Sequence, residues 1–315
     1  MKRILSIDGG GIRGIIPALL LAAIERITKR HVADLFDMIA GTSTGGILAL
    51  GLVKPSGNGT PQYTASSLAT LYSQQGARIF KRSRMPLKNL WGPKYASDGI
   101  ESVLAEYFGD AQLSDAIKPV LVTAADNERR KPFFFRSEEA KTDPTEQFLM
   151  RDAARATSAA PTFFAPHYLE NSSRPRPLSL IDGGVHSNHP GMAALVDAHA
   201  MWPGEEYFMV SLGTGQQTKQ IAHQDAAKWG LVGWAPNIMD TVLDGGPQTV
   251  DYQLRVILNG NGRQRYHRMQ LTLMPEHAAM DDASARNLHA LELLADDFID
   301  ANRERIEQVC EVLAA

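Results

Sequence analysis

The chain has 315 residues, of which 44% are hydrophobic and 21% are charged, so it is long enough and apolar enough to bury a substantial core. Its formal net charge of −3 excludes a protein that binds nucleic acid through its overall charge, and no nucleic-acid partner is expected. The single cysteine, Cys310, excludes an internal disulfide and a clustered-cysteine metal site, and the lack of an uninterrupted apolar run of about 18 residues excludes a membrane-spanning helix.

The N-terminal segment is predicted to form a buried strand, a glycine-rich turn and a helix. The strand runs from Arg3 to Ile7, and the turn has the sequence Asp8-Gly9-Gly10-Gly11-Ile12-Arg13-Gly14. Apolar residues then recur at helical spacing on one stripe, which consists of Ile15, Ile16, Leu19, Leu20, Ala23, Ile24 and Ile27. A helix that packs this stripe on a core is therefore expected to follow the turn.

The glycine turn matches the pattern G-x-G-x-x-G over residues 9–14, and this pattern has several interpretations. A dinucleotide-binding turn and a plain tight turn both fit the spacing. We favour an oxyanion hole, because consecutive glycines expose backbone N–H groups beside a helix N-terminus. Arg13 would add positive charge suited to a phosphate head group or to steadying the loop, and a surface or packing arginine is the alternative.

The next predicted strand, turn and helix carry a serine at the apex of the turn. The apolar run 36–40 is followed by Gly41-Thr42-Ser43-Thr44-Gly45, and residues 46–50 continue as a helix. In the G-x-S-x-G pattern a sharp turn exposes the serine hydroxyl, and the flanking glycines let strand and helix approach each other. A dinucleotide site would instead require an acidic residue at the end of this strand. Ser43 is therefore a candidate nucleophile, at a helix N-terminus that favours negative charge.

The rest of the chain alternates between predicted helices and strands. After a loop at 54–61, the expected elements are a helix at 65–80, strands at 118–125, 132–135 and 207–212, a helix at 238–258, a strand at 268–274 and helices over 285–313. This alternation predicts an α/β fold with a mainly parallel central sheet and helices on both faces.

The segment 78–95, with the sequence RIFKRSRMPLKNLWGPKY, mixes basic residues with large apolar ones. Such a mixture suits contact with an anionic lipid surface, and it also suits a lid or a wall for an acyl chain. A solvated loop that packs its aromatic side chains on the body is an equal alternative. Because basic and aromatic residues together also bind nucleotides, a regulatory nucleotide site stays open.

A third strand ends in an acidic residue followed by two glycines, Asp182-Gly183-Gly184. An isolated D-G-G is most often a turn. Here, however, it follows a strand, as the two earlier motifs do, and open α/β sheets build their sites where strands end. A serine nucleophile needs a base, and Asp182 can serve if the two side chains meet. The stretch 212–215 (LGTG) closes another strand near this face, where a turn is expected, with pocket lining as the alternative.

Histidine is the main competitor for the role of base. The histidines after Asp182 are His186, His189, His199, His223, His267, His277 and His289. A Ser–acid–His triad of the α/β-hydrolase kind needs several strands before its serine, whereas this chain has room for two, and its glycine triplet is led by Asp8 rather than by histidine. These two facts count against a triad. If Asp182 is the base without a histidine, burial is expected to raise the pKa of its carboxyl above the free value of about 4.

Together these motifs resemble the patatin-like phospholipases, lipid acyl hydrolases with a Ser–Asp dyad. The resemblance rests on DGGGIRG at 8–14, GTSTG at 41–45, DGG at 182–184 and the segment 152–164 that precedes the aspartate strand. It implies a patatin-like three-layer α/β sandwich, with Ser43 as nucleophile and Asp182 as general base. It also implies an oxyanion hole formed by the backbone amides of Gly10 and Gly11, with Thr44.

The resemblance extends over about the first 215 residues. We therefore expect a patatin-like catalytic core at 1–215 and a mostly helical part at 216–315 packed on the same domain. The implied function is cleavage of carboxylic esters by a phospholipase A, lysophospholipase or carboxylesterase without a metal or an organic cofactor. The expected partner is a phospholipid or another acyl ester, met at a membrane or micelle surface, and the motifs leave the oligomeric state open.

Three alternatives to this function stay open: a nucleotide-binding α/β protein, a nucleotide-activated phospholipase effector, and a storage or scaffold protein that keeps the fold without turnover. A cytoplasmic location, with peripheral membrane association, is expected. The reason is that Asp8 and the glycines interrupt the apolar stretch after Lys2 and Arg3 too early for a secretory signal.

Overall fold

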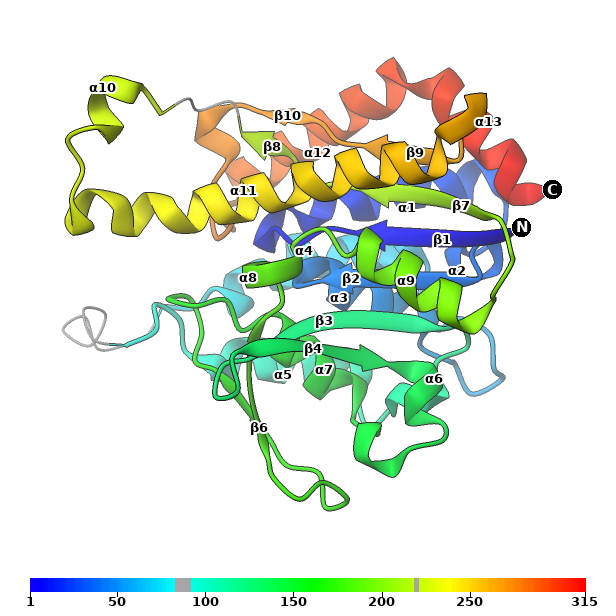
Figure 1. Ribbon diagram of the computed structural model, residues 1–315, viewed down its shortest axis with the longest axis horizontal. Helices are drawn as coiled ribbons and strands as arrows, with labels where there is room; N and C mark the ends of the chain where they lie inside the picture. Colours follow the sequence, from blue (N-terminus) through cyan, green and yellow to red (C-terminus); the bar gives the residue numbers. More distant parts are fainter. Residues whose placement is uncertain (83–91, 218–220) are drawn as a thin grey trace.

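A central β-sheet runs through the molecule, as Figure 1 shows. The computed structural model describes residues 1–82, 92–217 and 221–315, except for the side chains of residues 231–232, 235–244 and 261. Within these ranges the sheet has eight strands, which are β1 (Lys2–Ile7), β2 (Met38–Thr42), β3 (Val120–Asp126), β4 (Lys131–Arg136), β5 (His167–Leu169), β6 (Leu178–Asp182), β7 (Tyr207–Leu212) and β9 (Tyr266–Met269). A separate short pair consists of β8 (Gln216–Gln217) and β10 (Thr272–Leu273).

The order of the strands is β5-β6-β3-β2-β1-β7-β9, and β4 also pairs with β3. The pairs from β3 to β9 along this order are parallel, whereas β4, β5 and β6 join in antiparallel pairs. The predicted mainly parallel α/β fold is therefore confirmed. One detail differs from a uniformly parallel sheet: β6, which ends in Asp182, runs antiparallel to β3 and stops opposite Ala124.

Helices cover both faces of the sheet and complete three layers (Figure 1). One layer contains α1 (Ile15–Thr28), α3 (Thr44–Val53), α4 (Ala65–Ile79), α5 (Ser97–Phe108), α7 (Met150–Thr157), α12 (Ala285–Ala301) and α13 (Arg303–Ala314). The other contains α8 (Gly184–Ser187), α9 (Gly191–Met201) and α11 (Leu231–Leu258). Strand side chains alternate between the two cores, so Leu5 and Ile7 join the core under α1 and α3, whereas Ile4 joins the core under α9 and α11.

Three shorter helices lie in the connections between these elements: α2 (Val32–Leu35), α6 (Ser137–Ala140) and α10 (His223–Ala226). Figure 1 shows α10 and the start of α11 projecting beyond the end of the sheet. No helix within the described ranges is both long and apolar enough to span a bilayer.

The structure corrects four local expectations. The helical stretch over 285–313 is two helices, because α12 ends at Ala301 and the side-chain amide of the next residue, Asn302, donates a hydrogen bond to the Phe298 carbonyl at 2.9 Å. The expected strand at 268–274 is two short strands, β9 and β10, which belong to different sheets. Helix α11 begins at Leu231, before the predicted start. Ile27 is 40% exposed, so the apolar stripe of α1 ends before it.

The start of α3 lies directly against the end of β1. A Cβ at Gly45 would be 2.2 Å from the Ile7 carbonyl oxygen, and a Cβ at Gly41 would be 2.1 Å from the Gly45 carbonyl oxygen. Because both contacts are with backbone atoms, no change of rotamer could relieve them. Only glycine at these two positions permits this approach of helix and strand.

We predict that Gly45→Ala destabilises the fold by roughly 1–3 kcal/mol, because the added methyl group must push α3 away from β1. Urea unfolding followed by circular dichroism measures the change. The matched control is Gly57→Ala in a surface loop, where a Cβ meets no atom within 4 Å and no loss of stability is expected. Equal unfolding midpoints for the two variants would contradict the prediction.

Candidate active site

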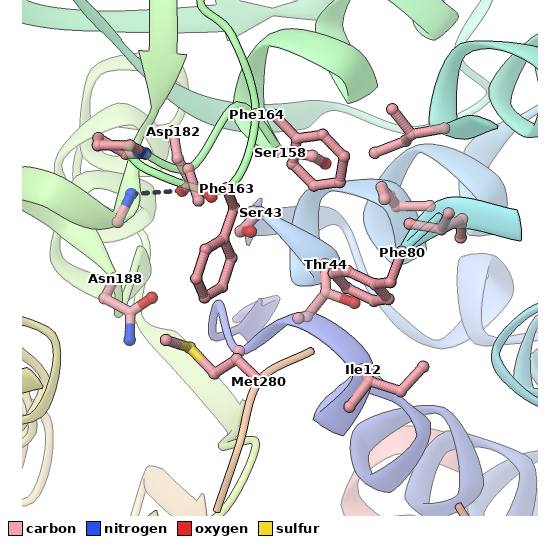
Figure 2. Close-up of a pocket in the computed structure, with 18 of the residues that line it drawn as sticks. Ile12, Ser43, Thr44, Phe80, Ser158, Phe163, Phe164, Asp182, Asn188 and Met280 are labelled. Carbon is pink, nitrogen blue, oxygen red and sulfur yellow. Dashed lines mark hydrogen bonds between the residues drawn. The ribbon is translucent and has the colours of Figure 1, made fainter. Parts of the chain in front are cut away.

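A cavity of about 210 Å³ opens where β1, β2 and β6 end. Its described wall is largely apolar and includes Ile12, Ile47, Leu71, Phe80, Ile100 and Phe164. Polar groups gather at one end, where Ser43 and Asp182 point toward each other (Figure 2). The cavity therefore joins a polar centre to an apolar chamber.

Ser43 occupies the turn between β2 and α3 in a backbone conformation that is rare for a residue with a side chain. Its φ is 53° and its ψ is −123°, which costs on the order of 1–3 kcal/mol. The Ser43 amide donates a hydrogen bond to the Thr157 hydroxyl at 2.7 Å, and the Gly46 amide donates to the Ser43 carbonyl at 2.9 Å. These bonds hold the strained turn, which lifts the half-buried hydroxyl into the cavity.

Asp182 lies at the end of β6 and is 5% exposed. Its Oδ1 accepts a hydrogen bond from the Gly184 amide at 2.7 Å, and the Ser43 hydroxyl lies on the cavity side of the carboxylate (Figure 2). Burial raises the pKa of Asp182 to about 6, although the Ser43 hydroxyl and the Gly184 amide act in the opposite direction. The structure thus places the side chains of the two predicted dyad residues together at one end of the cavity.

The antiparallel course of β6 explains how Asp182 comes to lie beside the turn that carries Ser43. Thr42, at the end of β2, pairs with Thr123 of β3, and Ala124 of β3 pairs with Asp182. Strand β6 runs antiparallel along the carboxyl-terminal residues of β3 and ends opposite Ala124. Its last residue, Asp182, therefore lies near the carboxyl end of β2. A Cβ at Gly183 would lie 2.1 Å from the Thr123 hydroxyl, so glycine is needed for the chain to turn at this point.

The glycine loop forms the wall beside Ser43. Gly10 and Gly11 both line the cavity, and among the described residues neither amide has a hydrogen-bond acceptor. Gly11 has φ 60°, and a Cβ there would lie 2.1 Å from the Met280 carbonyl oxygen. The neighbouring amides are engaged, since Gly9 donates to the Asn188 carbonyl at 3.0 Å and Ile12 to the Met280 carbonyl at 2.8 Å. Within the described ranges, these two donors without an acceptor belong to the two glycines that the family resemblance implied for an oxyanion hole.

Thr44 and Gly14 connect this loop to the helix that follows Ser43. Thr44 is the first residue of α3, and its hydroxyl forms a hydrogen bond with the Tyr72 hydroxyl at 2.6 Å. A Cβ at Gly14 would lie 2.1 Å from the Thr44 hydroxyl, so the loop and α3 are packed closely here. Thr44 lines the cavity, and its amide lies in the first turn of α3. An N–H group in the first turn of a helix has no acceptor within the helix.

Arg13 does not line the Ser43 cavity. Its buried side chain lines a second, polar cavity behind the glycine loop, and its Nε donates a hydrogen bond to the Gly10 carbonyl at 3.2 Å. Of the interpretations considered for Arg13, the structure supports the one in which it steadies the loop.

Sequence reasoning did not find several residues that support the loop from this second cavity. Arg268, on β9, forms a buried ion pair with Asp8 and donates a hydrogen bond to the Ser211 hydroxyl at 2.7 Å. Thr214 donates a hydrogen bond to the Gly9 carbonyl at 2.7 Å. The stretch 212–215 carried a local signal for Thr214, whereas Arg268 lies 260 positions from Asp8 in the sequence and no local pattern marks it.

The two histidines closest to Asp182 in sequence have structural partners. His186 Nε2 bonds to the Ala124 carbonyl at 2.8 Å. His189 is buried between the Tyr266 and Ser211 hydroxyls, each 3.1 Å from its Nε2, and burial holds its pKa well below the usual value. Neither is among the described residues that line the Ser43 cavity. Both histidines therefore bond to strand residues of the sheet, His186 to β3 and His189 to β7 and β9.

The basic segment 78–95 is only partly visible, because residues 83–91 lie outside the described ranges. At its two ends, Arg78 pairs with Glu106 at 2.6 Å and Lys94 pairs with Asp281. Phe80 lines the cavity, and its ring lies edge-on to that of Tyr95 with centroids 5.4 Å apart. The described ends of the segment thus form part of the cavity wall and pack on the body.

Comparisons with known proteins place this chain in one family. The model of the patatin-like phospholipases matches residues 5–195. Patatin-like protein 2 of Oryza sativa subsp. indica is 33% identical over 98% of this chain and 86% of its own length, and patatin-like protein 4 of Arabidopsis thaliana is 31% identical over 96% and 84%. A relative in Solanum tuberosum, probable inactive patatin-3-Kuras 1, is 29% identical over 95% and 86%.

Among solved structures, the crystal structure of VipD from Legionella pneumophila aligns with 94% of this chain and 67% of its own chain, at 12% identity and a TM-score of 0.37. An alignment this weak carries no argument. The match of the family model to more than half of the chain, and the relatives that match almost its full length, carry the conclusion. This chain belongs to the patatin-like phospholipase family.

Proposed function

We propose that this protein is a lipid acyl hydrolase in which Ser43 is the nucleophile and Asp182 is the general base. One observation carries the proposal: the Ser43 hydroxyl, in a strained turn, faces the buried Asp182 carboxylate in a cavity that Gly10 and Gly11 also line, and the amides of these glycines have no acceptor among the described residues. Family membership supports cleavage of lipid esters as the general reaction.

In the first step Ser43 Oγ attacks the ester carbonyl carbon while its proton passes to Asp182. The carbonyl oxygen becomes an oxyanion, and the amides of Gly10, Gly11 and Thr44 are the donors we assign to it. Collapse of this intermediate breaks the ester C–O bond. The alcohol leaves with the proton from Asp182, and an acyl group stays on Ser43.

In the second step Asp182 accepts a proton from water, and the resulting hydroxide attacks the acyl-enzyme. The same amides hold the second oxyanion, and the carboxylic acid is released as Ser43 recovers its proton. A free carboxyl with a pKa of about 4 would be a weak base for this reaction. The raised pKa of Asp182 brings it closer to the working pH.

The apolar chamber supports an acyl chain as the group that enters the cavity. Ile12, Leu71, Ile100 and Phe164 form walls without charge, and burying each methylene of a chain contributes about 0.8 kcal/mol. The same walls disfavour a dinucleotide beside the glycine loop, because phosphates require polar or charged partners. A lipid at a membrane or micelle surface, of the phospholipid or lysophospholipid class, is the substrate we propose.

We predict that Ser43→Ala lowers ester turnover by about 10³-fold or more and that Asp182→Asn lowers it by about 10²-fold or more. Hydrolysis of a p-nitrophenyl acyl ester and of phosphatidylcholine in micelles measures both losses. Labelling with a fluorophosphonate, followed by peptide mapping, identifies the nucleophile directly, with the adduct expected on Ser43.

Ser158 provides an internal control for the labelling, since it lines the same cavity but donates its hydroxyl hydrogen to the Ala154 carbonyl at 2.7 Å. Ser158→Ala is therefore expected to keep the adduct on Ser43. An adduct on Ser158, or near-normal turnover by Ser43→Ala, would refute the proposed function.

The raised pKa of Asp182 predicts a single ionisation in the pH profile. The base must be deprotonated to accept the serine proton, so kcat/KM should be constant above pH 7 and fall about ten-fold per pH unit below the pKa of about 6. Initial rates between pH 4.5 and 8.5 measure the profile, and circular dichroism confirms that the protein stays folded. A kcat/KM that is flat down to pH 4.5 would exclude Asp182 as the base.

Holding this carboxylate in a buried site should also reduce stability, in a pH-dependent way. The pKa in the folded protein, about 6, exceeds the ordinary value of 3.8, so the unfolded chain ionises more readily and ionisation opposes folding. At pH 7.5 the cost is roughly 2–3 kcal/mol, at about 1.4 kcal/mol per pH unit, and it disappears below pH 4, where both states are protonated.

We therefore predict that Asp182→Asn is more stable than the wild type at pH 7.5 and that this advantage shrinks as the pH falls to 4. Urea titrations at the two pH values measure the difference. A difference in the free energy of unfolding between variant and wild type that is the same at both pH values would show that ionisation of Asp182 carries no such cost.

A further inference from the structure

The glycine loop separates two cavities, and Thr214 lies on the side away from Ser43. Thr214 is 3% exposed and lines the polar cavity together with Asp8, Arg13 and Arg268. Its hydroxyl donates a hydrogen bond to the Gly9 carbonyl at 2.7 Å. Nothing in the proposed reaction uses this side chain directly, because it is not among the described residues that line the Ser43 cavity.

The bond to the Gly9 carbonyl also determines where the next amide points. In a planar trans peptide the carbonyl of one residue and the N–H of the next point in opposite directions, and no cis peptide is present among the described residues. Because Thr214 holds the Gly9 carbonyl on the side of the polar cavity, the Gly10 N–H is directed to the opposite side. That side is the cavity that contains Ser43.

The loop needs a hydrogen bond from another part of the chain, because its glycine residues do little to prevent rotation of the Gly9–Gly10 peptide group. Turning the peptide between Gly9 and Gly10 requires rotation about ψ of the first residue and φ of the second, and glycine permits a wide range of both. Gly10 has φ 164°, and its neighbour Gly11 has φ 60°, so two different conformations follow each other without a side chain to hold either. For the Gly9–Gly10 peptide, the hydrogen bond that selects one orientation comes from outside the loop, from Thr214.

Strand pairing brings Thr214 to this position. Ile7 of β1 pairs with Leu212 of β7, and the Asp8 amide donates to the Leu212 carbonyl at 3.0 Å. The two chains therefore leave the sheet side by side, which sets Thr214 next to Gly9 and Gly10. A Cβ at Gly10 would lie 2.2 Å from the Thr214 hydroxyl oxygen, so the loop and the threonine are in close contact.

We propose that Thr214 is a positioning residue, which holds the Gly9–Gly10 peptide so that the Gly10 amide points at the oxyanion. This inference rests on the proposed function of Ser43 and deepens it. Arg13 acts on the following peptide in the same way, since its bond to the Gly10 carbonyl directs the Gly11 amide toward the same cavity. Thr214 gives the cleaner test, because valine matches its shape and lacks its hydroxyl.

The test compares Thr214→Val with Thr214→Ser, which removes the methyl group but keeps the hydroxyl. With a soluble p-nitrophenyl ester, Thr214→Val should lower kcat about ten-fold and leave KM within about two-fold, because the oxyanion exists only in the transition state. Thr214→Ser should stay within about three-fold of the wild-type kcat. All values are calculated per serine titrated with fluorophosphonate, which removes any effect of misfolded protein.

A second readout separates positioning from a general loss of structure. A trifluoromethyl ketone carrying the same acyl group forms a tetrahedral oxyanion adduct with the serine, and its affinity should fall in Thr214→Val by the same factor as kcat/KM. The matched control is Thr28→Val in α1, which removes an equivalent bond, from a threonine hydroxyl to the Ile24 carbonyl at 2.8 Å, at the other end of the sheet. Its kcat should equal that of the wild type.

Two results would overturn the inference while leaving the proposed function intact: a wild-type kcat in Thr214→Val, or an equal loss of kcat in Thr214→Ser and Thr214→Val. If Thr214→Val does not fold, the comparison of Thr214→Ser with Thr214→Ala decides in the same way. A fluorophosphonate adduct elsewhere than on Ser43 would instead overturn the proposed function, and this inference with it.

Discussion

The structure around Ser43 depends on one close approach of backbone to backbone, between the start of α3 and the end of β1. Gly45 lies against the Ile7 carbonyl, and Gly41 lies against the Gly45 carbonyl, at distances that leave no room for a side chain. This approach places the turn that carries Ser43 directly beside the glycine loop that follows β1. Ser43 and the two glycines with exposed amides, Gly10 and Gly11, therefore line one cavity.

The glycine loop divides the region into two environments with different physical roles. On one side lies an apolar chamber, in which the Asp182 carboxylate is buried and its pKa is raised. On the other side lie the ion pair of Asp8 with Arg268 and the hydrogen bond from Thr214. Glycine residues give the loop its exposed amides but no rigidity of its own. The polar groups behind the loop provide the rigidity, and they keep their charges away from the chamber proposed for the acyl chain.

Much of the local structure could be predicted because it follows from short-range sterics. The strand, turn and helix around Ser43 follow from short-range sterics, and the structure has all three, with the strand at Met38–Thr42 rather than 36–40 and the helix beginning at Thr44. The alternation of elements predicted the mainly parallel sheet, and the motifs predicted the family, and both are confirmed. The catalytic roles of Ser43 and Asp182 stay predictions, since contact between two groups is not a measurement of turnover.

The amino-acid sequence by itself determined the strand–turn–helix units at the candidate site, the α/β class and the residue types of the site, because these depend on periodicity and on the steric freedom of glycine over a few positions. Only the tertiary structure decided that β6 runs antiparallel and so meets β2 at its end, that Arg13 faces away from Ser43, and that Thr214 and Arg268 support the glycine loop. These contacts join residues up to 260 positions apart. They depend on the order and register of the strands, which no local sequence pattern encodes.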